Sequence, residues 1–140
     1  MQQLIYVSAA VRPFRYVDLR DMLTKARKFN GSQAISGMMV YQARSVLQAL
    51  EGPEDAVITL FERIRRDPRH TAIRLVSRTS ISLKEFENWP MGLVDNLKEG
   101  PDVIGYGDYS AIQILGIDVA RAKTVLTALQ RGPWRRLADH

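Results

Sequence analysis

The chain has 140 residues, of which 46% are hydrophobic and 25% charged, and its formal net charge is +5. This mixture is typical of a globular domain with an ordinary core. The absence of cysteine excludes disulfides, thiolate metal sites and cysteine nucleophiles. Since no stretch approaches the roughly 20 apolar residues that cross a bilayer, and the first residues lack a signal-peptide pattern, we expect a cytoplasmic protein without a membrane partner. The charge allows a nucleic-acid partner but does not require one.

The start of the chain is predicted to form a strand followed by a helix. Residues 2–10 are short, β-branched and aromatic, and both of their alternating faces are largely apolar, which favours an interior strand. Apolar residues then recur at helical spacing from Asp18 to about Phe29. Asn30 is either the cap of this helix or the last residue of its inward stripe. The strength of Asn-Gly as a helix terminator favours the cap.

A polar residue interrupts an apolar strand in the next segment. Ile35–Tyr41 and Ser45–Glu51 are predicted strands, and the three residues between them indicate a hairpin. In the second strand Gln48 shares its face with Val46 and Leu50. Its amide therefore needs a hydrogen-bond partner.

A second helix is predicted from Pro53 to Asp67, because proline suits the first helical position and another proline follows Asp67. Arg63 and Asp67 are spaced to pair on its flank, an interaction that contributes about 0–1 kcal/mol when exposed. His70 is expected at the surface or as a cap. With two histidines in the whole chain, a histidine metal site is not expected.

Two further strands complete the pattern. Residues 72–81 alternate, and Trp89–Val94 reads as an edge strand because Pro90 cannot donate to an inner ladder. The order strand, helix, strand, strand, helix, strand is the α+β, ferredoxin-like βαββαβ pattern, with both helices on one face of an antiparallel sheet. The first and third strands are neighbours in that fold, so Tyr6 and Gln48 could be neighbours on one face.

We expect residues 1–94 to form the core domain and residues 95–140 a C-terminal loop and helical extension. Glycine and proline mark residues 95–109 as a short helical fragment and loop, and residues 118–130 have helical periodicity. The apolar stripe of this last helix consists of Val119, Ala122, Val125, Leu126 and Leu129. It must pack either on the bare face of the sheet or on another subunit.

The candidate site is found partly by excluding known nucleotide-binding and catalytic motifs. The G-Y-G at 105–107 lacks the rest of a dinucleotide fingerprint, and the sequence has no P-loop, G-x-S-x-G elbow or H-E-x-x-H. The polar residues Tyr6, Asn30 and Gln48 remain. Each could be satisfied within the protein, but an unpaired buried polar group costs about 1–3 kcal/mol. Three of them together favour a polar, planar ligand beneath or between the two helices.

Five motifs follow one another along the chain. They are L-I-Y-V-S at Leu4–Ser8, N-x-x-x-x-I-S-G-M-M-x-Y at Asn30–Tyr41, L-Q-A-L-E-G at Leu47–Gly52, F-E-R-I-R-R-D-P-R-H at Phe61–His70 and F-E-N-W-P-M at Phe86–Met91. In this order they resemble the BLUF family, the blue-light sensors that use FAD. The resemblance covers Leu4 to about Val94 and does not extend convincingly over the last third of the chain.

The resemblance implies a ferredoxin-like fold with FAD held between its two helices. Tyr6 matches the photoactive tyrosine, which gives an electron and a proton to the excited flavin. Gln48 matches the glutamine between that tyrosine and the flavin ring, whose amide rearranges after light. Asn30 matches the asparagine that hydrogen-bonds the pyrimidine side of the ring.

Four more positions follow from the resemblance. Arg63 and Asp67 match residues of the second helix that contact the flavin. Trp89 and Met91 match the tryptophan and methionine of the last strand, which respond to the glutamine. The implied function is a photoreceptor rather than an enzyme, which signals to a separate effector protein and is expected to form homo-oligomers.

Two residues depart from the family pattern. Val46 stands where an aromatic residue is common, and Pro90 separates Trp89 from Met91 where proline is less usual. The proline bears on the flexibility of the output strand. We expect the photochemistry to survive both changes.

Two other classes of function stay open. A small acylphosphatase-like enzyme would need an arginine-lined anion loop after the first strand, for which Arg12 and Arg15 are available. A basic nucleic-acid-binding module would use the tail around Trp134. Its binding would weaken steeply with salt.

Overall fold

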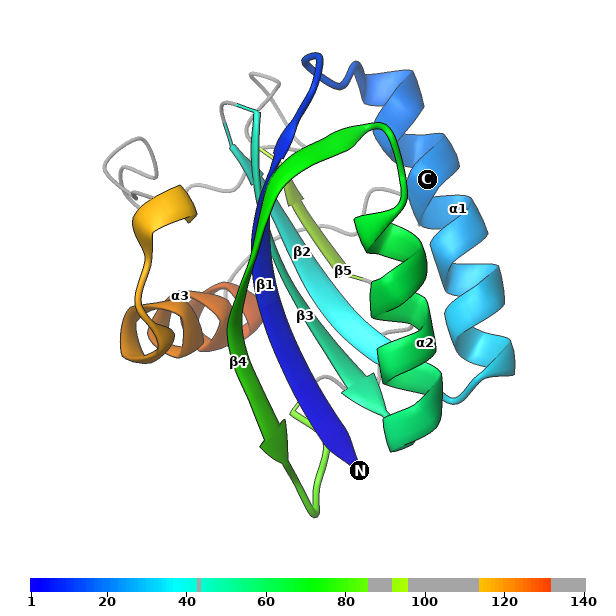
Figure 1. Ribbon diagram of the computed structural model, residues 1–140, viewed down its shortest axis with the longest axis vertical. Helices are drawn as coiled ribbons and strands as arrows, with labels where there is room; N and C mark the ends of the chain where they lie inside the picture. Colours follow the sequence, from blue (N-terminus) through cyan, green and yellow to red (C-terminus); the bar gives the residue numbers. More distant parts are fainter. Residues whose placement is uncertain (43, 86–91, 96–113, 132–140) are drawn as a thin grey trace.

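The fold is a five-stranded sheet with helices on both faces (Figure 1). The computed structural model describes residues 1–42, 44–85, 92–95 and 114–131. In chain order the elements are β1 (Gln2–Ala10), α1 (Tyr16–Ser32), β2 (Ser36–Gln42), β3 (Ser45–Gly52), α2 (Glu54–Arg65), β4 (His70–Ser80), β5 (Gly92–Asp95), the 3₁₀ turn η2 (Ile114–Gly116) and α3 (Val119–Arg131). This order confirms the α+β, ferredoxin-like prediction with a fifth strand and a C-terminal helix.

The strands lie in the order β4-β1-β3-β2-β5. β3 pairs antiparallel with β1 and β2, and β1 pairs antiparallel with β4. Tyr6 lies opposite Gln48, so the predicted neighbours are confirmed. The sequence predicted an antiparallel sheet, but β5 runs parallel to β2 at the edge opposite β4. The predicted strand residues Trp89, Pro90 and Met91 lie outside the described residues.

Both core helices end away from their predicted boundaries. α1 continues through Asn30 to Ser32, so Asn30 is not the cap that the Asn-Gly pair indicated. Its carbonyl oxygen accepts the N–H of Ile35 at 2.8 Å, which links the end of the helix to the chain entering β2. α2 ends at Arg65, short of the predicted Asp67. The proline after Asp67 disfavours helical geometry at that aspartate.

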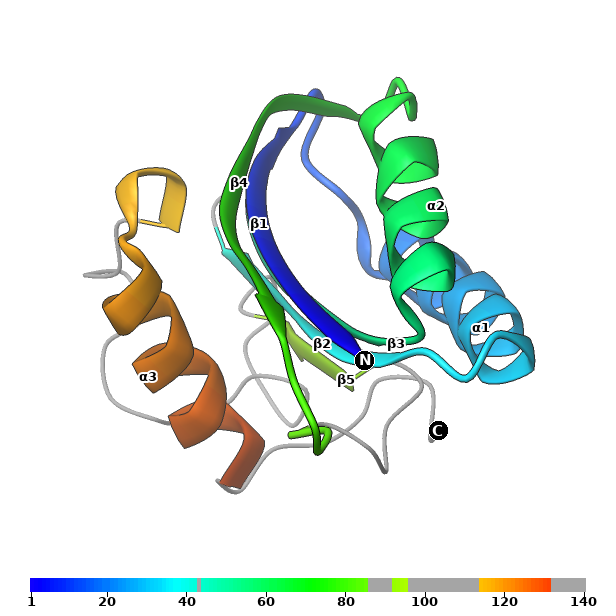
Figure 2. The ribbon, with the colours of Figure 1, turned by 60° about the horizontal axis from the view of Figure 1, so that its bottom comes forward.

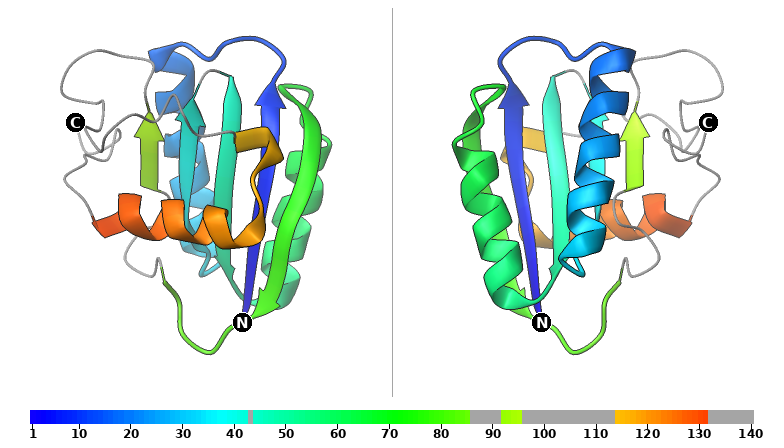
Figure 3. Two further views of the ribbon diagram at one scale, coloured as in Figure 1. Left: turned by 90° about the vertical axis from the view of Figure 1, so that its left-hand side faces the viewer. Right: turned by 90° about the vertical axis from the view of Figure 1, so that its right-hand side faces the viewer.

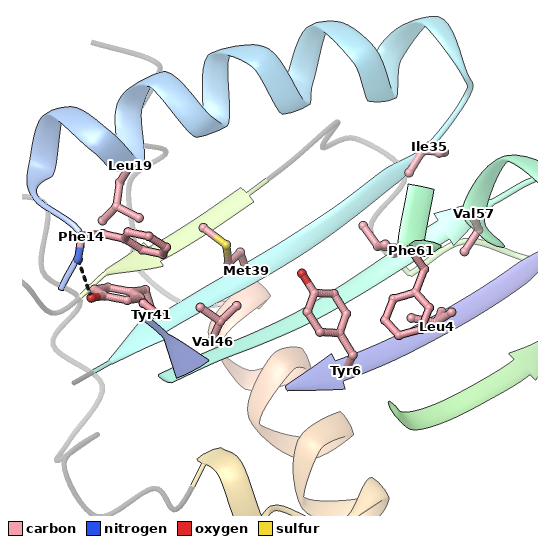
Figure 4. Close-up of a cluster of buried hydrophobic side chains, with 12 residues drawn as sticks. Leu4, Tyr6, Phe14, Leu19, Ile35, Met39, Tyr41, Val46, Val57 and Phe61 are labelled. Carbon is pink, nitrogen blue, oxygen red and sulfur yellow. Dashed lines mark hydrogen bonds between the residues drawn. The ribbon is translucent and has the colours of Figure 1, made fainter. Parts of the chain in front are cut away.

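Because successive side chains of a strand point to opposite faces of the sheet, the strands contribute to two separate hydrophobic clusters. Leu4 and Tyr6 of β1 join the cluster beneath α1 and α2, whereas Ile5 and Val7 join the cluster beneath α3. Figure 2 shows the sheet between α1 and α2 on one side and α3 on the other. In the cluster beneath α1 and α2, the rings of Tyr6 and Phe61 lie 5.4 Å apart (Figure 4).

Residues 114–131 pack on the sheet face away from α1 and α2, and α3 crosses the strands there (Figure 3). Ala122, Val125 and Leu126 of the predicted stripe are buried against the sheet, but Val119 at the start of α3 is exposed. Arg74 of β4 donates hydrogen bonds to the carbonyl oxygens of Leu115 in η2 and of Ile117 in the connection to α3. The division of the chain near residue 94 stays a prediction.

Within the described residues, no helix combines the length and apolar character needed to cross a membrane.

Candidate functional site

A cavity of about 420 Å³ lies between α1, α2 and the sheet. Its volume is within the range of about 300–1,000 Å³ that is usual for small-molecule and cofactor sites. It is lined by Tyr6, Met22, Lys25, Ala26, Phe29, Asn30, Met39, Gln48, Leu60, Arg63, Ile64, Asp67, Arg69 and His70. All five predicted cofactor-binding residues are in this set. Trp89 and Met91 lie outside the described residues, so their placement stays a prediction.

Tyr6 and Gln48 form the polar floor of the cavity. Their side chains come from the central strands β1 and β3 and are 1% and 7% exposed. The Tyr6 hydroxyl donates a hydrogen bond to Oε1 of Gln48. Burial, together with the negative charge of Asp67, raises the pKa of the Tyr6 phenol well above its usual range. The tyrosine is therefore a neutral hydrogen-bond donor, and it is the partner that the strand glutamine required.

Asn30 lies in the last turn of α1 with only 1% of its surface exposed. Its backbone carbonyl accepts from Gln33 and Ile35, while the residue as a whole lines the cavity. Since the helix continues past Asn30, the structure agrees with the alternative interpretation of the sequence, in which Asn30 is the inward residue of the last turn.

Arg63 lies at the rim of the cavity. Its guanidinium carbon is 4.7 Å from the centre of the Phe29 ring, a cation–π contact that connects α2 with α1. Asp67 was expected to pair with Arg63, but in the structure it pairs with Arg69. Asp67 lies beyond the end of α2 and accepts hydrogen bonds from Arg69, including one from its backbone N–H at 2.9 Å. These bonds lower the pKa of the Asp67 carboxyl.

The sequence reasoning missed Arg69 and His70 as lining residues. His70 is half-buried rather than a surface or capping residue, and its Nδ1 lies 3.0 Å from the buried Ser8 hydroxyl. Burial lowers the pKa of its imidazole, which favours the neutral ring. The sequence did contain a signal, because both residues belong to the D-P-R-H stretch of the fourth motif. The predicted strand began two residues too late, since β4 begins at His70.

The lining has the chemistry of a site for a planar, polar ligand. Apolar side chains from both helices form the walls, the Tyr6–Gln48 pair and Asn30 present hydrogen-bonding groups, and Arg63 puts a positive charge at the rim. These groups fit the isoalloxazine ring of a flavin, which is flat, carries donors and acceptors along one edge and bears an anionic tail in FAD. Among the described residues, no three metal-ligating side chains converge. Arg15, a candidate for an anion loop, pairs instead with Asp18 at the start of α1.

This fold and cavity define a ferredoxin-like, ligand-binding α+β domain. The sequence profile of the BLUF family, described as sensors of blue-light using FAD, matches residues 1–92. The chain therefore belongs to the BLUF family, whose cofactor is FAD.

Individual relatives agree with this assignment. The photoactivated adenylate cyclase subunit beta of Euglena gracilis is 42% identical over 73 residues, which are 52% of this chain and 8% of that protein. The ground-state structure of BlsA is 27% identical with a TM-score of 0.80, and the match covers 97% of this chain and 91% of that one. The dark-state structure of BlrB, a BLUF protein, is 29% identical with a TM-score of 0.65, covering 67% of this chain and 71% of that one.

Proposed function

We propose that the chain is a light-driven switch whose moving parts are Tyr6 and Gln48. The observation that carries the proposal is their direct hydrogen bond on the cavity floor, formed by a buried tyrosine and a buried amide in facing strand positions. When bound, FAD supplies the absorption of blue light and an excited state that accepts an electron and a proton. Tyr6 gives up both and takes both back, so the cycle has no net chemical product.

After this cycle the side-chain amide of Gln48 has a different orientation and different hydrogen bonds. In the described state its Oε1 accepts from the Tyr6 hydroxyl. While the phenol is without its proton, this oxygen lacks the hydrogen bond from Tyr6, and the amide can turn its NH₂ group toward the tyrosine oxygen. One neutral hydrogen bond contributes only about 0.5–1.5 kcal/mol, roughly a tenfold shift of a population. Coupled changes elsewhere are therefore part of the switch.

The remaining lining residues bind and shield the cofactor in this proposal. Asn30 would hydrogen-bond the flavin ring, and Arg63 and Asp67 would contact the flavin. Leu60 and Ile64 of α2 form part of the apolar wall and keep water from the floor. These roles are supported by the positions of the five residues, because all of them line the same cavity.

The output is signalling rather than catalysis. We propose that Trp89 and Met91 respond to Gln48 and that the signal passes to a separate effector protein, from a cytoplasmic chain that forms homo-oligomers. The Euglena relative is a photoactivated cyclase subunit, and the chain spans 8% of its length. This supports the sensing role of the matched region. A pull-down performed in darkness and in blue light would identify the effector.

The decisive test is the absorption spectrum of the purified protein before and after blue light. The wild type should be yellow and show a light-induced red shift that decays in darkness, whereas Tyr6→Phe should keep the flavin and lose the shift. Tyr41→Phe is the matched control, because Tyr41 is also buried on this sheet face but does not line the cavity. A colourless wild type, or a normal shift in Tyr6→Phe, would refute the proposal.

A further inference from the structure

A buried carboxylate lies at the end of β3, away from the cavity. Glu51 has 0% of its surface exposed. Nε2 of Gln3 donates to its Oε2 at 2.7 Å, and the backbone N–H of Glu85 donates to its Oε1 at 2.8 Å. Both oxygens of one side chain are thus engaged, by β1 on one side and by the connection that follows β4 on the other. A buried carboxylate is costly unless such bonds hold it, so its place in the fold is well defined.

Glu51 stands in the same strand as Gln48, with its side chain on the opposite face. Gln3 and Ser36 are its register partners on β1 and β2, and both are buried. The carboxylate is therefore held in the three central strands of the sheet. Any displacement of β3 relative to β1 would therefore alter the hydrogen bond of Gln48 to Tyr6 on one face and that of Glu51 to Gln3 on the other.

A second bond ties the same connection to the rest of the fold. Nζ of Lys84 donates to the carbonyl oxygen of Ala34 at 2.6 Å, in the link between α1 and β2. The end of β3 approaches this link closely, because a Cβ added to Gly52 would lie 2.9 Å from the same Ala34 oxygen. Lys84 and Glu85 are therefore anchored at two points. From there the chain continues through residues 86–91 to β5, which pairs with β2.

We propose that Glu51 is a positioning residue for the light response. By holding the Glu85 backbone, its carboxylate ties the connection that follows β4 to the strand that carries Gln48. The bonds of Glu51 to Gln3 and to Glu85 act as a clamp that sets the lifetime of the light-adapted state, because a displacement of β3 must strain or break them. This inference rests on the proposed photoreceptor function and adds a residue outside the cavity to it.

The test compares dark-recovery rates of the light-induced red shift in flavin-loaded protein. Glu51→Ala should recover about tenfold faster, the factor that corresponds to the loss of one to two hydrogen bonds. Glu51→Gln should stay within about threefold of the wild type, because its amide oxygen still accepts from Glu85 while the Gln3 amide turns its own oxygen toward the new NH₂. The dark spectrum should be unchanged in both variants. Glu62→Ala, which removes an exposed carboxylate on α2, is the control and should recover like the wild type.

Lys84→Met keeps the test decisive if Glu51→Ala does not fold. It removes the second anchor without touching the buried cluster and should speed recovery about two- to threefold, in keeping with one partly exposed bond. Wild-type recovery in Lys84→Met, and in Glu51→Ala where it folds, overturns the clamp. Glu51→Gln recovering as fast as Glu51→Ala overturns its hydrogen-bond basis. A wild type without any red shift is a different result, because it refutes the photoreceptor function itself.

Discussion

The two faces of the sheet show how one set of strands serves two purposes. Beneath α3, alternate residues of β1, β2 and β3 form an apolar cluster with Ile114, Ile117 and the buried side of α3. Beneath α1 and α2, the same strands present Tyr6 and Gln48 to a cavity of about 420 Å³. Protein interiors are normally packed without such spaces. The helix face therefore leaves space for a ligand, whereas the α3 face is packed with apolar side chains.

This contrast predicts that substitutions will separate into two groups. Changes on the α3 face should alter the free energy of unfolding and leave the red shift intact. Changes on the cavity floor should alter the red shift with a smaller effect on unfolding. The following variants test that separation, from the largest expected effect on stability to the smallest.

Leu47→Ala should lower the free energy of unfolding by about 2–5 kcal/mol, because Leu47 is fully buried in the α3-side core and its truncation leaves a cavity. Urea unfolding of the flavin-loaded protein measures the loss, and the red shift of the folded fraction should match the wild type. Leu115→Ala, at an exposed position on η2, is the control and should stay within about 0.5 kcal/mol. Loss of the red shift in folded Leu47→Ala would show that the two faces are not separable.

Gln48→Leu should abolish the normal red shift while lowering the free energy of unfolding by only about 1–3 kcal/mol. The shift depends on an amide that can turn, and the stability loss comes from a Tyr6 hydroxyl left without its acceptor. The double variant Tyr6→Phe/Gln48→Leu removes that orphaned hydroxyl and should regain part of the stability. Light–dark difference spectra and urea unfolding provide the two measurements. A normal red shift in Gln48→Leu would place the switch elsewhere.

Arg74→Met should lower the free energy of unfolding by about 1 kcal/mol, the net contribution of a partly exposed hydrogen-bonded group. Its guanidinium bonds the carbonyl oxygens of Leu115 and Ile117 at 2.9 and 2.7 Å, so its loss loosens the entry to α3. Faster hydrogen exchange in α3, with an unchanged red shift, is the expected signature. Arg65→Met removes an exposed ion pair on α2 and serves as control. Equal exchange in α3 for both variants would contradict this role of Arg74.

Asp67→Asn should produce the smallest effect, visible mainly as a change in pH dependence. The Asp67 pKa is lowered by hydrogen bonds from Arg69, so the carboxylate adds stability above its unfolded pKa of 3.8, and this is lost as the pH falls through the folded pKa. The stability gap between wild type and variant should therefore be present at neutral pH and close below about pH 4. Urea midpoints across this range measure it, with the exposed Asp21→Asn as control. A gap that persists in acid would assign the effect to packing.

Several parts of the site followed from local rules. Strand alternation and the βαββαβ order indicated that Tyr6 and Gln48 could be neighbours, because a period of two gives the residues that share a face and the strand order gives the adjacent strands. The register that sets Tyr6 opposite Gln48 came from the structure. Other parts did not follow. Asn-Gly correctly indicated the end of a helix, but the two extra residues of α1 and the inward position of Asn30 depend on packing against the sheet. The choice of Arg69 over Arg63 as the partner of Asp67 depends on where α2 ends.

The sequence by itself determined the order of the elements, the two apolar faces of the central strands and the pair on the cavity floor. These features depend on periodicity and on residues that are close in sequence or directly paired. Only the tertiary structure decided that α3 covers the second face, that His70 turns inward beside Ser8 and that Glu51 holds the Glu85 backbone. Each of these contacts joins segments far apart in the chain, and their geometry is fixed by competition among many packing alternatives.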